Sequence, residues 1–505
     1  MPSKVLFSFW SDKIKQFANI PAYLKILLLI AVLYCPYFLH LGNLPIRTWD
    51  EARLVANAVE MQEDGNYLVT HFYGNPEMWN TKPPLMIWCQ VFFMKVVGNE
   101  EISFRLPSAI AGFITCLLIV FVTARYLKSY WLGFIAIMIL ITSEGHLGGH
   151  VARTGDYDAM LTLFITLYSL CFFLWVETDK KKFLHLFFTG LTLAVLTKGV
   201  QGLMFLPAVI IYGLAMRKTG KLLSNKWFYI DLLIFMGITA GYYLARESVN
   251  PGYLKAVYDN ELGGRLLNTI EQHEHKFNYY YDLLLTTQFK FYCTLALLGF
   301  FASFAILKGP TRRLIQYSTL LSIIYLLIIS LAKTKLKWYS APAIPMLSIM
   351  AAMPIFLVFS LIPKYLSDVK WHKVRILQSL FLIIMFLYPY FTIMDQVYEP
   401  KDDWGARQFT LMGYFLQDVD KGFYNIDNHK ICYSDYKVQL EYYTNKLNKK
   451  GANISFAKPD ELKVGDRVVY LMGADRNQID SKFKTTEVFS YDLVRIITID
   501  SLVTH

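Results

Sequence analysis

Long apolar runs recur along most of the chain and stop near residue 395. Each approaches the roughly 20 residues that a helix needs to cross a bilayer. The clearest lie at residues 106–124, 159–176, 199–216, 314–332, 338–363 and 376–394, and shorter or interrupted runs lie at 26–46, 130–143, 183–197, 228–245 and 291–307. This pattern predicts an all-α polytopic membrane protein with about 11–13 transmembrane helices.

The pattern of apolar and polar residues changes at about residue 396. Short alternating runs such as "KICYSDYKVQLEYY" and "DRVVYLMG" follow, separated by Gly, Asn, Asp and Lys. We therefore predict a transmembrane domain over residues 1–395 and a small α/β domain over 396–505.

Composition agrees with the membrane class. Of the 505 residues 55% are hydrophobic and 18% are charged, whereas soluble proteins carry about 25% charged residues. The net charge of +11 comes largely from Lys and Arg clusters between spans, for which topology and contact with anionic lipids are sufficient reasons. Membrane lipids are thus expected partners, and nothing indicates nucleic acid.

The segment after Lys82, "PPLMIWCQVFFMKVVG", decides the topology. Its apolar part spans only about ten residues before Lys95, so it is predicted to be interfacial or re-entrant. If it does not cross, the basic N-terminus and the Lys- and Arg-rich loops share the cytoplasmic side, as the positive-inside bias requires. The outer side then receives residues 47–105, 144–158, 246–282 and everything after about 395.

The first outer stretch contains "TWDEAR", residues 48–53. Apolar residues then recur at helical spacing up to Gly65, which predicts an amphipathic helix lying in the membrane surface. Thr48 and Glu51 have the spacing of a capping box, which gives Glu51 a structural role. Asp50 is not needed for the cap, although an acid there also favours the helix dipole. It is therefore a candidate catalytic carboxylate.

Cations on the outer side run against the orientation bias. They are Lys82, Arg105, Arg153, Lys198, Arg265, Lys333, Lys335 and Lys337. Gathered from distant segments, they predict a basic ring around a lipid-linked phosphate at headgroup depth. Snorkelling to lipid phosphates is an equally good reason for any single lysine.

Two further outer segments carry candidate chemistry. In "HVARTGDYDAM" Asp156 and Asp158 stand directly before a span, where either acid caps a helix or joins Asp50 as the second carboxylate of an acid/base pair. In the third loop His273 and His275 offer metal ligands or substrate contacts, although two histidines in a loop are a weak metal signal.

Taken together these motifs resemble a known superfamily. "DEA" is followed by "KPPL", "RLPS", an Arg-x-x-x-x-Asp-Ala element, "LTKG" and "KLKWYxxPAIP". This order is similar to that of the protein O-mannosyltransferase superfamily of polyprenyl-phosphate-sugar glycosyltransferases, most of all to its bacterial lipid A aminoarabinose transferase branch. The resemblance covers most of residues 45–350. It implies the glycosyltransferase C fold, a bacterial inner (plasma) membrane location, and transfer of a sugar from a polyprenyl-phosphate carrier with inversion.

The resemblance also implies roles for single residues. Asp50 matches the general base, Glu51 its neighbour and Asp158 the acid of the second loop, which together form the implied catalytic set. The implied donor phosphate-binding set is Lys82, Arg265, Lys335 and Lys337, and further substrate-binding candidates are Arg153, Asp156, Tyr339, His273 and His275.

The chain departs from that branch at two positions. The branch often has an acid before its "KPPL" lysine and a histidine three residues before the arginine of the later loop, both associated with a metal. Here these positions hold Thr81 and Leu262. No cofactor therefore follows from the sequence, and a divalent metal stays an open alternative.

The acceptor is also open, and lipid, glycan and protein acceptors all fit. An oligosaccharide or O-antigen ligase would use similar donors but should lack the "DEA…KPPL" order. A lipid-phosphate transporter or flippase should place ionisable residues in mid-span and show internal repeats, whereas these charges gather at one face.

Overall fold

The computed structural model describes residues 21–266, 273–367, 369–400 and 404–503. Each of the eleven apolar runs corresponds to a helix in it. These helices are α2 (Ala22–Phe38), α5 (Glu101–Arg125), α6 (Tyr130–Ile141), α8 (Asp158–Thr178), α9 (Lys181–Lys198), α10 (Leu206–Ala215), α12 (Lys226–Val249), α15 (Tyr292–Ala305), α16 (Gly309–Leu331), α17 (Ile344–Tyr365) and α18 (Trp371–Tyr398). The prediction of an all-α polytopic fold is confirmed.

Helix lengths refine the expected number of spans. Within the described residues, seven helical segments are long and apolar enough to cross a membrane, and an eighth arises if the bent pair Tyr279–Gln288 and Tyr292–Ala305 counts as one broken span. The pair is bent by 111°. The helices α2, α6 and α10 are shorter, as is α4 (Leu85–Val97), which has 13 residues. The short α4 corresponds to the segment that the sequence predicted to be too short to cross.

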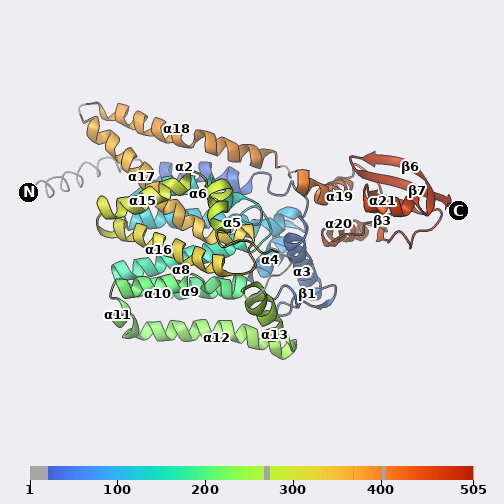
Figure 1. Ribbon diagram of the computed structural model, residues 1–505, viewed down its shortest axis with the longest axis horizontal. Helices are drawn as coiled ribbons and strands as arrows, with labels where there is room; N and C mark the ends of the chain where they lie inside the picture. Colours follow the sequence, from blue (N-terminus) through green and yellow to red (C-terminus); the bar gives the residue numbers. More distant parts are fainter. Residues whose placement is uncertain (1–20, 267–272, 368, 401–403, 504–505) are drawn as a thin grey trace, which may run out of the picture.

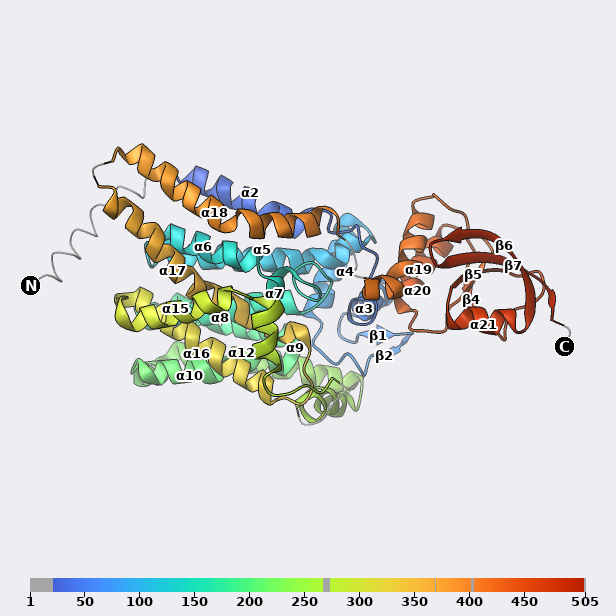
Figure 2. The same cartoon turned by 45° about the horizontal axis from the view of Figure 1, so that its top comes forward.

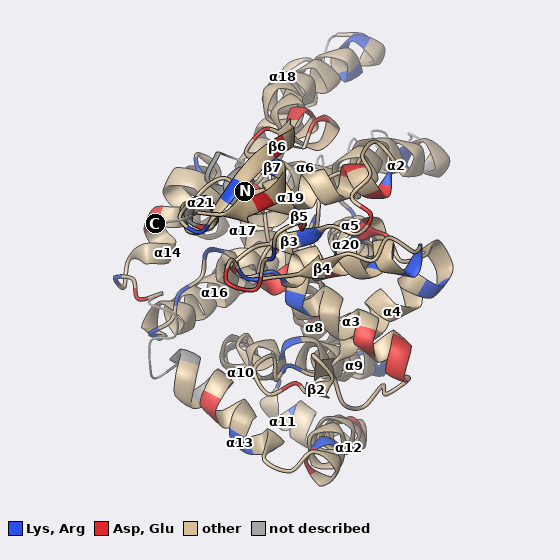
Figure 3. Ribbon diagram, turned by 90° about the vertical axis from the view of Figure 1, so that its right-hand side faces the viewer, with Lys and Arg blue, Asp and Glu red and all other residues tan. Residues whose placement is uncertain are grey.

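The bundle has two distinct ends (Figures 1 and 2). One end carries α11 (Thr219–Leu223) and the turn between α17 and α18. The other carries α3 (Asp50–Asp64), the hairpin of β1 (His71–Phe72) and β2 (Asn75–Pro76), α13 (Tyr253–Val257) and the C-terminal sheet. The segments predicted to face outward therefore lie at one end of the bundle, and Figure 3 views the molecule from that end.

The C-terminal part forms a mixed five-stranded sheet with three helices. Its strands are β3 (Lys430–Cys432), β4 (Ser455–Phe456), β5 (Arg467–Leu471), β6 (Phe483–Tyr491) and β7 (Val494–Leu502), in the order β4-β3-β5-β7-β6. β3 pairs in parallel with β4 and β5, while β7 is antiparallel to β5 and β6. The helices are α19 (Trp404–Asp420), α20 (Val438–Lys449) and α21 (Ala474–Asp480). The predicted α/β composition of this region is confirmed.

A buried tyrosine joins this sheet region to the bundle. Tyr443 of α20 donates a hydrogen bond to Glu101 at 2.9 Å, and its hydroxyl accepts one from the Ile46 N–H at 3.0 Å. Nearby, Lys446 forms an ion pair with Glu100 at 2.7 Å. These contacts fix α20 against the beginning of α5 and the segment that leads into α3.

Helix α3 is enclosed by protein on two sides. Its apolar residues Ala52, Val55, Ala58 and Met61 belong to one buried cluster with side chains from α4 and from α19 and α20. Gly65 ends the helix in the left-handed region at φ +69°, as the sequence predicted. The sequence expected the apolar face of α3 to lie on lipid, but this face instead packs on α4 and the C-terminal helices.

Candidate active site

Asp50 is the first residue of α3. Trp49 directly before it has φ +66°, which a non-glycine residue adopts only at a cost of about 1–3 kcal/mol. The Asp50 side chain is 53% exposed. The turn thus directs this carboxylate away from the core, where it is free to reach a substrate.

Glu51 faces the opposite way and is fully buried. Its Oε1 accepts hydrogen bonds from Arg105 at 2.7 Å and from the Gly155 N–H at 2.8 Å. Its Oε2 accepts from Arg105 at 2.9 Å and from the Arg47 N–H at 2.8 Å. Burial alone raises the pKa of Glu51, but Arg105 and the two backbone donors outweigh it and lower the pKa to about 2. A carboxylate so firmly ionised and so fully hydrogen-bonded is unsuited to accepting a proton.

Arg105 completes this buried pair. All five of its N–H groups donate: two bonds reach Glu51, and three reach the carbonyls of Leu41, Leu44 and Pro45 at 2.7–3.1 Å. The capping box expected from Thr48 and Glu51 is not formed, because Glu51 points to Arg105 and no side chain caps α3. Arg105 and Glu51 together hold the chain that leads into α3, and through Gly155 they tie it to the second outer loop.

The lowered pKa of Glu51 predicts a pH-dependent stability difference. Because the folded-state pKa lies below the ordinary value of 4.5, the stabilisation from the ionised Glu51 is present above about pH 4.5 and is lost as the pH falls towards 2. The difference in thermal midpoint between the unsubstituted protein and Glu51→Gln should therefore shrink over that window. A difference that stays constant from pH 6 to pH 3 would contradict this account of the pair.

The second outer loop brings Asp156 and His150 to Asp50. His150 Nδ1 lies 3.2 Å from Asp156 Oδ2 and 3.9 Å from Asp50 Oδ2. These three atoms all lie within 4.8 Å of one another. Neither His150 Nδ1 nor Asp156 Oδ2, both buried, has a hydrogen bond of acceptable geometry. Residues about a hundred positions apart therefore meet in one cluster, which we call the Asp50–His150–Asp156 cluster.

His150 is held in place by its backbone and by its ring. It has φ +64°, a second left-handed non-glycine residue beside the acids. Its imidazole stacks on the indole of Trp338 with ring centroids 3.8 Å apart. The sequence predicted roles for other residues of "HVARTGDYDAM" but none for His150, since no motif spacing distinguishes it and Trp338 lies nearly 190 positions further along the chain.

Lys82 approaches the same region. Its Nζ lies 3.2 Å from Glu261 Oε1 and 5.6 Å from the centroid of the Tyr157 ring. Because Tyr157 stands between Asp156 and Asp158 in the chain, Lys82 is close to the second outer loop. Glu261, in η2 (Tyr258–Leu266), was not predicted as a site residue.

Asp158 lies deeper than Asp156. It begins α8 and is buried, and both of its carboxylate oxygens accept from Lys198 Nζ at 2.7 Å. Lys198 also lies over the Tyr339 ring at 5.0 Å. The acid of the second loop that stands beside Asp50 and His150 is thus Asp156, whereas Asp158 forms a buried pair with the lysine of "LTKG".

Two other predicted residues, Arg153 and Arg265, are not seen to contact the Asp50–His150–Asp156 cluster in the described part of the structure. Arg153 donates to the carbonyls of Pro36 and Leu39 at 2.8 Å and so satisfies the end of α2. Arg265 belongs to η2, and its side chain lies outside the described part of the structure.

The third loop meets the "KTKLKWY" run. His273 accepts a backbone hydrogen bond from Lys335, whose buried Nζ donates to the Ala332 carbonyl at 2.6 Å. His275 stacks on Tyr279 with ring centroids 4.1 Å apart, and Lys337 is exposed.

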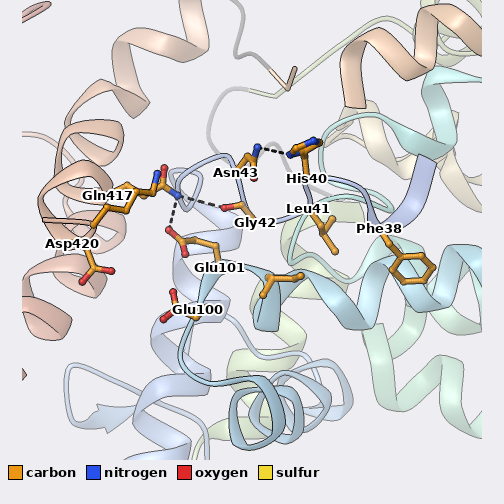
Figure 4. A pocket seen from close by; sticks show the side chains of 11 residues that line it. Phe38, His40, Leu41, Gly42, Asn43, Glu100, Glu101, Gln417 and Asp420 are labelled. Carbon is orange, nitrogen blue, oxygen red and sulfur yellow. Dashed lines mark hydrogen bonds between the residues drawn. The ribbon is translucent and has the colours of Figure 1, made fainter. Parts of the chain in front are cut away.

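A separate pocket of about 620 Å³ lies at the joint between the bundle and the C-terminal region (Figure 4). Gln417 reaches into it and donates to the Gly42 carbonyl and to Glu101, while Glu100 and Asp420 both pair with Lys446. None of the predicted site residues lines this pocket. Its acids already have partners, so the chemistry is expected at the Asp50–His150–Asp156 cluster instead.

Comparison with known proteins agrees with the motifs. The profile of the family described as dolichyl-phosphate-mannose-protein mannosyltransferase matches residues 81–243. An uncharacterized protein of Aquifex aeolicus is 28% identical over 361 residues, which are 71% of this chain and 67% of that protein. The undecaprenyl phosphate-alpha-4-amino-4-deoxy-L-arabinose arabinosyl transferase of Shewanella sediminis is 27% identical over 335 residues, which are 64% of this chain and 58% of that protein.

The fold is similar to that of a solved transferase. The crystal structure of ArnT from Cupriavidus metallidurans bound to undecaprenyl phosphate aligns with 94% of this chain and 98% of its own, with a TM-score of 0.64 and 14% sequence identity. This likeness shows the glycosyltransferase C fold, and with it a multi-pass membrane protein. The sequence matches confirm the resemblance to polyprenyl-phosphate-sugar glycosyltransferases, and the solved structure shows that the fold is shared.

Proposed function

We propose that this enzyme moves a sugar from a polyprenyl-phosphate carrier to an acceptor hydroxyl on the extracytoplasmic side of the bacterial inner membrane, with inversion at the anomeric carbon. The observation that carries the proposal is the convergence of Asp50, His150 and Asp156 beside Lys82 and Lys198, which come from separate segments of the chain. The N-terminus is then cytoplasmic, and the C-terminal region, residues 396–505, is an extracytoplasmic domain.

Asp50 is the general base in this proposal. The acceptor oxygen attacks the anomeric carbon, and its proton passes to the Asp50 carboxylate. The bond between the anomeric carbon and the phosphate oxygen breaks, and its electron pair leaves with the polyprenyl phosphate. Asp50 suits this role because its side chain is exposed at the end of a fixed helix, whereas Glu51 beside it is occupied by four hydrogen bonds.

Cations stabilise the leaving phosphate. Its charge needs no general acid if positioned cations absorb it. Lys82 is the first candidate, with Arg265, Lys335 and Lys337 as the cations that the superfamily motifs supply. Lys198 is committed to Asp158 and positions the beginning of α8. Glu51 is likewise assigned a positioning role, through Arg105.

The pairing of Lys82 with Glu261 predicts opposite effects for two substitutions. Lys82→Ala should weaken binding of undecaprenyl phosphate roughly 10–100-fold, because a hydrogen bond to a charged group contributes about 1.5–3 kcal/mol. Glu261→Gln should leave binding unchanged or tighten it, because the lysine loses a competing carboxylate. Both affinities can be measured by titrating purified protein in nanodiscs with the lipid.

Two outcomes would remove Lys82 from the phosphate site. One is unchanged affinity in Lys82→Ala. The other is equal weakening in both variants, which would show that the ion pair matters only for local structure. Lys95→Ala is the matched control. Lys95 lies near the end of α4, the helix that follows Lys82, and its ammonium group donates a hydrogen bond to the Tyr67 hydroxyl.

The proposed function itself is tested with purified protein, a polyprenyl-phosphate sugar and mass spectrometry. The donor should be consumed only when a suitable acceptor is present, and polyprenyl phosphate should be released in equal amount. Comparing envelope lipids, glycans and glycoproteins before and after gene deletion identifies the acceptor by the missing sugar mass. Sugar transfer without release of polyprenyl phosphate would contradict the proposal.

A further inference from the structure

We infer that Tyr157 and Asn80 are positioning residues for Lys82, which they hold where it meets the phosphate of the carrier lipid. This inference rests on the proposed function, because it takes Lys82 as the first cation at that phosphate. The sequence predicted no role for either residue. Neither needs to touch the lipid, since both act through the lysine.

Tyr157 presents its ring to Lys82. The Lys82 Nζ lies 5.6 Å from the ring centroid, which is within the range of a cation–π attraction. Tyr157 is 5% exposed and belongs to the main apolar cluster of the bundle, so packing fixes the ring. A ring face attracts an ammonium group without the strong hydrogen bonds by which a carboxylate competes with phosphate. The ring therefore orients Lys82 without competing for it.

The hydroxyl of Tyr157 is anchored to the segment that carries Lys82. It accepts a hydrogen bond from Asn80 Nδ2 at 2.9 Å and donates one to Asn80 Oδ1 at 3.2 Å. Asn80 is 7% exposed and stands two residues before Lys82. The ring face thus meets the lysine while the hydroxyl meets the amide, so this short segment and the tyrosine fix each other's positions.

The Asn80 amide also links this segment to the helix of the candidate base. Its Nδ2 donates to Asn57 Oδ1 at 3.1 Å. Asn57 is fully buried on α3, about two turns after Asp50, and its own Nδ2 donates to the His71 carbonyl at 2.7 Å. Asn80 therefore joins α3, the segment of Lys82 and the second outer loop. Transfer between bound reactants requires such a fixed relation between the base and the cation at the phosphate.

The competing explanation is that Tyr157 serves packing alone. A loss of volume in the apolar cluster weakens the fold whatever Lys82 does. Two features favour the positioning role: the ring faces the ammonium group, and the hydroxyl pairs with an amide two residues from the lysine. A double-substitution cycle separates the two roles, because a positioning residue affects lipid binding only when Lys82 is present.

The test is the binding of undecaprenyl phosphate to the purified full chain in nanodiscs. Tyr157→Leu removes the ring face and should weaken binding about five- to thirtyfold, the range for a desolvated cation–π contact. In the Lys82→Ala background the same substitution should change the affinity by less than about twofold. Tyr157→Phe keeps the ring and loses only the hydroxyl, so it should weaken binding less than Tyr157→Leu does.

Asn80→Ala tests the anchor and keeps the inference testable if Tyr157→Leu does not fold. It breaks the same two hydrogen bonds as Tyr157→Phe and keeps the ring. Each single variant should weaken binding, and the double variant should bind no more weakly than Asn80→Ala alone. Additive losses, or no loss in either single variant, would remove Asn80 from the positioning role.

Tyr67→Leu is the matched control. The Tyr67 ring also lies beside a lysine, because the Lys95 Nζ is 5.2 Å from its centroid. That lysine has no role at the phosphate in the proposed function. The Tyr67→Leu variant should therefore bind undecaprenyl phosphate like the unsubstituted protein.

Two results would overturn the inference: unchanged binding in Tyr157→Leu, or an equal loss of affinity with and without Lys82, which would show a role in packing alone. Neither result touches the transferase assignment, because sugar transfer is measured separately. If Lys82→Ala itself binds the lipid normally, Lys82 is not at the phosphate. Both this inference and the phosphate role of Lys82 in the proposed function would then fall.

Discussion

Replacing Asp50 by Asn is expected to lower the rate of sugar transfer by about 10²–10⁴-fold, the usual contribution of a general base. The amide has nearly the same shape as the carboxylate but cannot take the acceptor proton. Because the Asp50 side chain is 53% exposed, the fold and the binding of carrier lipid should be preserved. The measurement is the initial rate of transfer by purified protein, beside thermal unfolding and lipid titration.

Asp64→Asn is the matched control for this experiment. Asp64 is the last residue of the same helix and pairs with His71 at the surface. Because surface ion pairs contribute little, its transfer rate should stay within about twofold of the unsubstituted protein. If Asp50→Asn retains full activity, or if Asp64→Asn loses as much, Asp50 is not the base.

Replacing Arg105 by Met is expected to give the largest loss of stability. It leaves the Glu51 carboxylate buried and without its cation, which typically costs about 3–5 kcal/mol. It also removes three hydrogen bonds to the carbonyls of the segment before α3. Thermal unfolding in detergent, followed by tryptophan fluorescence, should show a clearly lowered midpoint.

The double substitution Arg105→Met with Glu51→Met separates stability from positioning. Removing both partners relieves the isolated charge, so much of the lost stability should return. Transfer should stay low, because the link from Arg47 through Glu51 to Gly155 is gone. A double variant with restored activity would show that the pair serves stability alone and does not position Asp50 relative to Asp156.

Most of the fold follows from the sequence, because apolar runs of helical length leave few alternatives. All eleven runs are helices, and α3 ends at Gly65, where its helical pattern stops in the sequence. The environment of α3 was predicted wrongly. Its apolar face packs on α4 and on helices beyond residue 400, and an amphipathic pattern does not indicate whether lipid or protein covers that face.

The candidate site was predictable only in part, and the reason is distance along the chain. Asp50, Lys82 and Asp156 stand in recognisable motifs, so the sequence singles them out. The role of Glu51 depends on Arg105, 54 positions away, and local spacing instead favoured a cap. His150 belongs to the candidate site because its ring lies beside Asp50, Asp156 and Trp338. No local sequence pattern predicts these contacts.

The most direct test of the central claim is a cryo-electron microscopy structure of this protein with undecaprenyl phosphate bound. We expect the lipid phosphate within hydrogen-bonding distance, about 3 Å, of Lys82 Nζ, with the Asp50 carboxylate on the side from which an acceptor reaches the phosphate-linked carbon. A phosphate bound at the opposite end of the bundle, or one separated from Asp50 by a layer of packed side chains, would contradict the account.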